Sequence, residues 1–228
     1  MSIGISIPLF NEEGAVEQVL HQTMFVLREA KIPFHLAVVN NGSTDSTGSI
    51  IDSMAQNFPE IIAIHFDKNQ GYGGGILAGM RALSPRDISV MGWMWGDGQV
   101  SPDVLPKLYH ACLDGHQMAK ACRTKRNDGL NRFLITGVYA SVMKALGSRT
   151  KDVNGCPKLF PAEIWRSIDL RSEDWFLDAE VILTAEQLQW SIHQESVIMK
   201  PRYYNESKVR LGTLLEFVWN ISKWRLKF

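Results

Sequence analysis

The sequence predicts one α/β domain built around a mostly parallel sheet with helices on its faces. Three observations indicate this class. Short apolar runs alternate with amphipathic stretches through the first half of the chain, as in successive βαβ units. The 228 residues suit a single domain with one large core. Loops rich in Asn, Asp and Gly follow four of the apolar runs.

Strands and helices are predicted in order along the chain. Ile3 to Pro8 reads as the first strand, and apolar residues at helical spacing from Val16 to Met24 predict a helix ending near Ala30. Further strands are predicted at His35–Val39, Ile61–Phe66, Ile88–Trp95 and Lys158–Phe160. Further helices are predicted to begin near Thr44 and at Ser101-Pro102, and to cover Ile76–Leu83 and Val181–Leu188. An amphipathic stretch covers Phe133–Leu146.

Composition excludes several classes of protein. Apolar residues make up 45% of the chain and charged residues 21%, which is ordinary for a globular domain. The formal net charge of zero gives no sign of nucleic-acid binding. Cys112, Cys122 and Cys156 have no zinc-site spacing, so we expect reduced thiols in a cytoplasmic protein. We expect no export signal at the N-terminus, and no apolar run approaches the ~20 residues of a membrane-spanning helix.

The polar loops after the predicted strands form the candidate binding site. In open α/β sheets ligands bind outside the carboxyl ends of the strands. Each loop alone is explained by turn chemistry, but their recurrence after successive strands favours a shared site. The glycines of 71–75 match neither GxGxxG nor a P-loop, so we expect them to allow close approach of backbone or ligand.

A metal site is one of two interpretations of the loop after the fourth strand. Asp97 and Gln99 are two residues apart, and a carboxylate with an amide oxygen suits a hard divalent cation that also holds diphosphate oxygens. The alternative is a solvated turn aspartate in Gly96-Asp97-Gly98. Spacing alone leaves both interpretations open.

Six segments in order resemble glycosyltransferase family two, and within it the polyprenyl-phosphate sugar synthases of the dolichyl-phosphate mannose synthase branch. The similarity covers nearly the whole chain and is carried by residues 7–13, 39–45, 68–79, 96–99, 152–160 and 202–210. It implies a GT-A fold and inverting transfer from a GDP- or UDP-linked sugar. It also implies a nucleotide-sugar-binding half at 1–120, an acceptor-side half at 121–208 and a C-terminal helix at 209–228.

The resemblance implies a role for each matching position. The nucleotide sugar would contact three segments, through Pro8, Phe10, Asn11, Glu12, Asn40, Asn41, Gly42, Lys68, Gly71, Tyr72 and Gly73, and the fourth loop through Trp95 and Gly96. Asp97 and Gln99 would bind Mg²⁺ or Mn²⁺ and the diphosphate. Arg202 and Lys208 would meet the leaving diphosphate, with charges that fit it. Arg123, Arg126 and Arg132 would bind an acceptor phosphate.

Two departures from the family pattern affect the donor site. Asn40-Asn41 replaces the usual Asp-Asp, so an amide stands where a carboxylate is expected to accept from base or ribose. Trp95 occupies the first position of the usual Asp-x-Asp metal motif and cannot ligate a metal ion. We therefore expect altered nucleotide specificity and metal dependence. A non-catalytic nucleotide-sugar-binding protein is one alternative.

The acceptor is predicted to be a polyprenyl phosphate, with a glycan hydroxyl as the alternative. A lipid phosphate is already an anionic nucleophile, whereas a hydroxyl needs a carboxylate to take its proton. The resemblance implies Asp178 or Glu180 for that role, with Glu180 on the acceptor side. A helix N-terminal acidic pair, favoured by the helix dipole, explains the same two residues without catalysis.

The C-terminal segment 209–228 is predicted to be a basic amphipathic helix. Apolar residues recur at helical spacing from Leu211 to Ile221, with two tryptophans among them. Such a helix can lie on an anionic membrane and bring the domain to a lipid acceptor at the cytoplasmic face. Packing of a terminal helix on the domain or on a second copy is the alternative.

Overall fold

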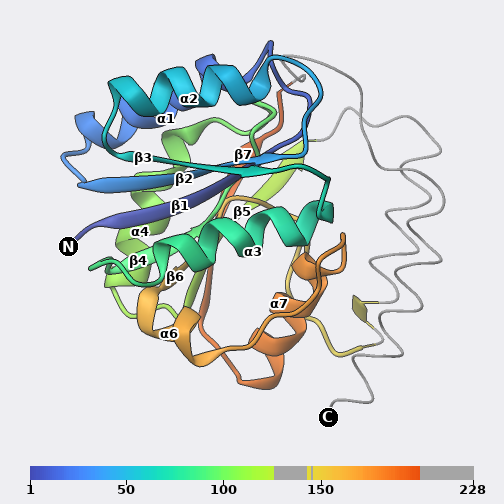
Figure 1. Cartoon of the computed structure of the whole chain (residues 1–228). Coiled ribbons are helices and arrows are strands. Elements are labelled where there is room, and N and C mark those ends of the chain that lie inside the picture. The colour runs from blue at the N-terminus through green and yellow to red at the C-terminus, as the bar shows by residue number, and fades with distance from the viewer. Residues whose placement is uncertain (126–142, 145, 201–228) are drawn as a thin grey trace.

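The chain forms a seven-stranded sheet with helices on both faces (Figure 1). The structure is a computed structural model that describes residues 1–125, 143, 144 and 146–200. The strand order is β3-β2-β1-β4-β6-β5-β7. The predicted α/β class is confirmed.

Four parallel strands form the N-terminal part of the sheet. They are β1 (Ile3–Leu9), β2 (Phe34–Asn41), β3 (Ile61–Phe66) and β4 (Val90–Trp93), with β1 in the middle, between β2 and β4. Residues on both faces of β1 and β2 are buried, as expected for parallel strands covered by helices on each side. Their carboxyl ends therefore meet at one edge, where the polar loops lie.

Three further strands extend the sheet on the β4 side. β6 (Lys158–Pro161) is antiparallel to β4, and β5 (Met118–Lys125) is antiparallel to β6. β7 (Ile192–Ile198) then pairs in parallel with β5 at the sheet edge. Register places Trp93, Lys158 and Lys120 side by side on neighbouring strands. Two lysines thus lie in the interior of the sheet.

Each face of the sheet has its own hydrophobic core. One is formed with α1 (Val16–Glu29), α2 (Thr47–Asn57) and α4 (Leu105–Leu113), which a short 3₁₀ turn at Pro102–Val104 precedes. The other is formed with α3 (Gly71–Leu83), α6 (Ala162–Ser167) and α7 (Leu177–Gln187). Figure 1 shows α1 and α2 on one side of the sheet and α3, α6 and α7 on the other.

Element boundaries differ from the predictions at several points. α3 begins at Gly71, five residues before the predicted start, because its glycines are part of the helix. α7 begins at Leu177, so Asp178 and Glu180 lie in its first turn. β5 and β7 were not predicted from the sequence. None of the described helices is long and apolar enough to cross a bilayer.

Candidate active site

Loops after β1 and β2 are joined by side chains at the predicted nucleotide-binding edge. Asn11, which has a positive φ of 52°, receives a hydrogen bond at Oδ1 from the Thr44 amide at 2.8 Å. The Asn11 amide donates to Ser43 Oγ at 3.0 Å, and the Glu12 amide donates to Thr47 Oγ1 at 2.9 Å. These bonds fix the two loops against each other, so Pro8–Glu12 and Asn40–Gly42 form one continuous rim.

Both asparagines that replace the family's usual aspartates hold backbone in place. Asn41 Oδ1 accepts from the Gln70 amide at 2.9 Å, and its Nδ2 donates to the Gly71 carbonyl at 2.8 Å. Asn40 Oδ1 accepts from the Ser43 amide at 3.0 Å, and its Nδ2 lies 3.2 Å from His65 Nδ1. An amide supplies both a donor and an acceptor, as Asn41 requires here. The surrounding groups therefore suit asparagine at both positions, because they use both the oxygen and the nitrogen of each side-chain amide.

The glycines at the start of α3 are packed against backbone. A Cβ on Gly73 would lie 2.1 Å from the Ser172 carbonyl oxygen, so no larger residue fits there. The Gly74 amide donates to the Glu173 carbonyl at 2.8 Å, which closes the contact. Close approach of backbone, one of the two expected uses of these glycines, is what the structure shows. Lys68, at the other end of this segment, is exposed.

The loop after β4 presents one carboxylate and one amide. Asp97 is buried, and its Oδ1 accepts from the Gln99 amide at 3.0 Å. Gln99 Nε2 donates to the Lys200 carbonyl at 3.3 Å, which fixes the orientation of the side-chain amide and so of its Oε1. No group of three or more His, Cys, Asp or Glu side chains with metal-site geometry occurs in the described part of the chain. Asp97 and Gln99 fit a cation held largely by substrate phosphates and water.

Trp95 belongs to a partly buried hydrogen-bonded chain. Its Nε1 donates to the Tyr72 hydroxyl at 2.9 Å, and that hydroxyl donates to Asp178 Oδ2 at 3.1 Å. Lys158 Nζ donates to Asp178 Oδ1 at 2.5 Å. Burial, and next the Asp178 charge, hold the Tyr72 pKa well above its usual value. The tyrosine is therefore a neutral hydrogen-bond donor within this chain.

Two further contacts fix the aromatic groups. The Tyr72 ring stacks on Trp175 with centroids 4.5 Å apart. The Arg123 guanidinium lies 5.3 Å from the centroid of the Trp95 ring, within cation–π range. Arg123 is itself paired with Asp152 through Nε, a terminal nitrogen and its backbone amide. Its charge is thus placed beside Trp95 rather than in open solvent.

Glu180 lies apart from this chain of contacts and organises a loop. Its Oε2 accepts from the Ser172 amide at 2.8 Å and from the Arg171 amide at 3.1 Å. That loop supplies the carbonyl against which Gly73 packs. The predicted acceptor-side role of Glu180 stays a prediction, while the structure shows the residue supporting the start of α3 indirectly.

Several predicted site residues lie outside the described residues: Arg126, Arg132, Arg202, Lys208 and the segment 209–228. The roles assigned to them remain predictions. The structure brings together Asn11, Asn41, Tyr72 and Gly73 on one set of joined loops. Trp95 and Asp178 are connected to the same set through Tyr72. Lys158, Asp152 and Trp175 were not predicted as site residues, because their contacts arise from sheet register and loop packing.

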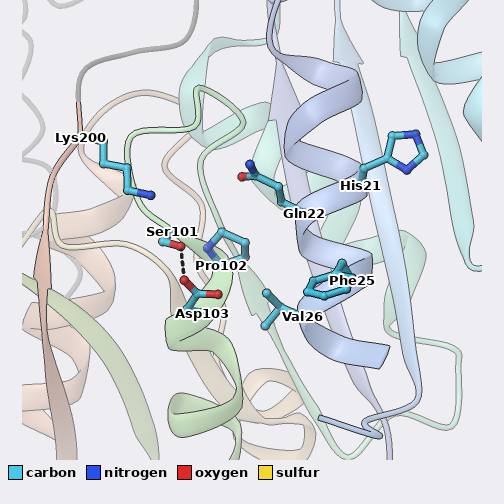
Figure 2. Close-up of a pocket in the computed structure, with 8 residues that line it drawn as sticks. All are labelled: His21, Gln22, Phe25, Val26, Ser101, Pro102, Asp103 and Lys200. Atoms are coloured by element: carbon cyan, nitrogen blue, oxygen red, sulfur yellow. Dashed lines mark hydrogen bonds between the residues drawn. The ribbon is translucent and has the colours of Figure 1, made fainter. Parts of the chain in front are cut away.

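A surface groove lies beside the Asp97–Gln99 loop. Figure 2 shows it between α1 and the Ser101–Asp103 turn, with Lys200 at one end. Its volume is about 410 Å³, and Phe25 on its α1 side is 66% exposed. The rim formed by Pro8–Glu12 and Asn40–Gly42 does not line it. The rim and the groove are therefore separate features.

A family model described as glycosyl transferase family 2 matches residues 5–162. The chain belongs to this family. The match covers β1 from Ile5 onward, the other three parallel strands, the joined loops and β6. It confirms the resemblance inferred from the strand-end segments and assigns the chain to the glycosyltransferases.

Related proteins agree with this assignment. An undecaprenyl-phosphate mannosyltransferase of Micrococcus luteus is 27% identical over 96% of this chain and 92% of its own length. An undecaprenyl-phosphate 4-deoxy-4-formamido-L-arabinose transferase of Photorhabdus laumondii is 28% identical over 68% of this chain. That match spans 47% of the Photorhabdus protein, so about half of the relative has no counterpart here.

Solved structures confirm the fold. Mannosyl-3-phosphoglycerate synthase of Rubrobacter xylanophilus superposes with a TM-score of 0.71 at 15% identity, over 100% of this chain and 73% of that one. Glucosyl-3-phosphoglycerate synthase of Mycobacterium tuberculosis, solved with Mn²⁺, UDP-glucose and phosphoglyceric acid, gives 0.70 at 16% identity, over 99% and 79%. The GT-A expectation is confirmed.

Proposed function

We propose that this glycosyltransferase moves a sugar, with inversion, from a nucleoside diphosphate sugar to a polyprenyl phosphate. One observation carries the choice of acceptor. The two oxygens of Asp178, the carboxylate best placed to be a base, are bound to Lys158 and Tyr72 in a buried setting. A hydroxyl acceptor needs a base, whereas a phosphate is already anionic. The names of the bacterial relatives support the same acceptor class.

The donor is proposed to lie along the joined loops. Its nucleoside would contact Pro8–Glu12, Asn40–Gly42 and Lys68–Gly73, and its diphosphate would reach Asp97. Because Asn40 and Asn41 are bound to neighbouring loops, we assign them to shaping this surface. Preformed loops reduce the entropy lost when the donor binds.

A divalent cation is proposed to bind together with the donor. Asp97 and the Gln99 amide oxygen would hold it, and when bound it would supply positive charge to the leaving diphosphate. The Mycobacterium structural neighbour, which was solved with Mn²⁺, supports this assignment. With one protein carboxylate in the motif, the cation should bind weakly until the donor phosphates are present.

Arg202, Lys208 and the segment 209–228 complete the proposal. The two cations would neutralise the leaving diphosphate, and Arg126 and Arg132 would attract the acceptor phosphate. Arg123, which was predicted to join them, is paired with Asp152 beside Trp95 and is proposed to position that loop instead. The basic amphipathic segment would bring the domain to the cytoplasmic face of a membrane, where a lipid acceptor lies.

The function is tested by direct detection of product. Purified protein is mixed with undecaprenyl phosphate in detergent, a divalent cation and a panel of GDP- and UDP-sugars, and glycosylated lipid is detected by mass spectrometry. One donor is expected to yield product, and Asp97→Asn to abolish it. Asp103→Asn, a nearby exposed carboxylate, is the matched control and should retain activity. Donor binding without product under every condition would favour the non-catalytic alternative.

A further inference from the structure

Lys120 is a buried lysine whose ammonium group is surrounded by backbone carbonyls. It lies in β5 with no exposed surface. Its Nζ donates to the carbonyls of Ala121 at 2.9 Å, Asp152 at 2.9 Å and Lys151 at 3.2 Å. An ammonium has three hydrogens, so these bonds use all of them. Lys120 thereby ties β5 to the loop that contains Asp152.

The charge of Lys120 is held in an unfavourable setting. Within the described residues, no carboxylate forms an ion pair with it. Lys158, its neighbour in the β5–β6 register, carries a like charge. Burial, and next the Lys158 charge, lower the Lys120 pKa to about 8. An apolar residue of the same shape would avoid the cost of burying this charge but would leave the three carbonyls without their donor.

The loop held by Lys120 leads directly to Trp95. Asp152 accepts hydrogen bonds from the Arg123 side chain and backbone amide. Arg123 in turn lies over Trp95, at the position where the family motif has its first metal-binding carboxylate. A continuous series of direct contacts therefore runs from Lys120 through Asp152 and Arg123 to Trp95.

We propose that Lys120 is a positioning residue of the transfer reaction, whose ammonium holds the Lys151–Asp152 backbone so that Asp152 keeps Arg123 over Trp95. The inference rests on the proposed function for its link to catalysis. Its structural part, the control of Trp95 by Lys120, stands independently. Lys120 does not touch substrate in this account and acts through Asp152 and Arg123.

Loss of the Lys120 proton should loosen this arrangement. A neutral amine has two hydrogens and a lone pair, so one of the three carbonyls loses its donor. The groups facing Lys120 are Lys158 on β6, Asp152 on its loop, Asp178 on α7 and Cys122 on β5. The first three are fixed in ion pairs or hydrogen bonds of their own. The effect of Cys122 must be distinguished from that of Lys120 by experiment.

The structural part is tested by NMR on the folded chain. The Trp95 indole N–H signal, assigned by its absence in Trp95→Phe, should shift with a midpoint near pH 8 in the wild type. Cys122→Ser should leave that transition in place, and Lys120→Met should remove it. An indole signal that does not change from about pH 6.5 to 9.5 would overturn the proposal, and this result needs no Lys120 variant.

The catalytic part is tested by transfer rates over the same range, with circular dichroism showing that the fold persists. Wild-type kcat/KM is expected to fall about tenfold above the transition, and Lys120→Met to be low and without that alkaline fall. Lys151→Met is the matched control, since it removes an exposed ammonium from the same loop but keeps the carbonyl. A Lys120→Met enzyme with the wild-type profile would refute the role. Absence of transfer with every donor would contradict the proposed function. The NMR experiment would then still decide whether Lys120 controls the position of Trp95.

Discussion

The Lys158 ammonium and the Asp178 carboxylate form an ion pair in the interior, with side chains 0% and 4% exposed. A tyrosine hydroxyl binds the second carboxylate oxygen. The pair joins β6 to α7 and, through Tyr72, reaches Trp95 in the loop after β4. The first turn of α7 thus supports the loop after β4 through Asp178 and Tyr72.

Removing one partner of this ion pair should lower the free energy of unfolding more than removing both partners together. Lys158→Met leaves a buried carboxylate without its cation and is predicted to lower the free energy of unfolding by about 3–5 kcal/mol. The double variant Lys158→Met/Asp178→Leu should recover most of that loss, because no buried charge remains. Urea denaturation of both single variants and the double variant measures the coupling. Additive losses would show that the two groups are independent.

Restoring a carboxylate at position 95 should strengthen cation binding. Trp95→Asp recreates the first acidic position of the family motif and is predicted to raise Mn²⁺ affinity, in the presence of the nucleoside diphosphate, by about tenfold. Isothermal titration calorimetry gives the affinity. Trp95→Phe is the control, since it loses the bond to Tyr72 without adding a ligand. Equal cation affinity in all three proteins would contradict a site at Asp97.

A substitution of Glu180 distinguishes a role in holding the 171–172 backbone from a role in binding the acceptor. Glu180→Gln weakens charge-assisted bonds from the amides of Arg171 and Ser172 and should lower the free energy of unfolding by about 1–2 kcal/mol. The KM for the acceptor should stay unchanged. A large increase in that KM at unchanged stability would instead assign Glu180 to the acceptor site. Thermal denaturation and steady-state kinetics together decide.

Stability should fall at alkaline pH because two buried thiols resist ionisation. Burial raises the pKa of Cys112 to about 12 and raises that of Cys156 as well. Unfolded thiols ionise near pH 8.5, so above about pH 9 the unfolded chain has released protons that the folded chain still holds. The free energy of unfolding therefore falls as pH rises, by up to about 1.4 kcal/mol per pH unit and thiol.

Lys120 has the opposite effect in part of this range. Its pKa is lowered to about 8, so the cost of burying its charge disappears as pH rises toward the usual lysine value. Two thiols, joined toward pH 10 by Tyr72 and Tyr109, whose pKa values burial also raises, outweigh one lysine and leave a net fall between about pH 9 and 10. Cys112→Ala should make the fall in urea-derived stability clearly shallower there. A slope equal to that of the wild type would show that Cys112 does not contribute.

The sequence predicted the parallel half of the sheet because its strands are buried runs separated by polar loops. Ile61–Phe66 matches β3 at both ends. β7 could not be predicted in this way, since exposed and half-buried residues alternate in it at the sheet edge. α3 was predicted too short because glycine-rich segments indicate loops, whereas here tertiary packing against residues 172–174 requires glycine in a helix.

Motif resemblance identified the loops that are predicted to bind the donor, but not the contacts that support those loops. Asn41 and Trp95 were identified as departures from a pattern, and their partners depend on contacts between distant segments. Tyr72 and Asp178 are 106 residues apart, and Lys158 meets Asp178 because β6 lies beside β4. No local spacing encodes such contacts. The pairing of Arg123 with Asp152 has the same origin.

A phosphate acceptor needs no base, so a comparison of two acceptors tests the proposed function. Undecaprenyl phosphate and undecaprenol differ only in the phosphate, and sugar transfer to each is compared by mass spectrometry with wild-type protein and Asp178→Asn. We predict product only with the phosphate. Asp178→Asn leaves the buried Lys158 without its counter-ion, so circular dichroism first has to show that the variant is folded. The folded variant should retain a substantial rate, because the amide oxygen can still accept from Lys158. Transfer to undecaprenol that Asp178→Asn abolishes would contradict the account.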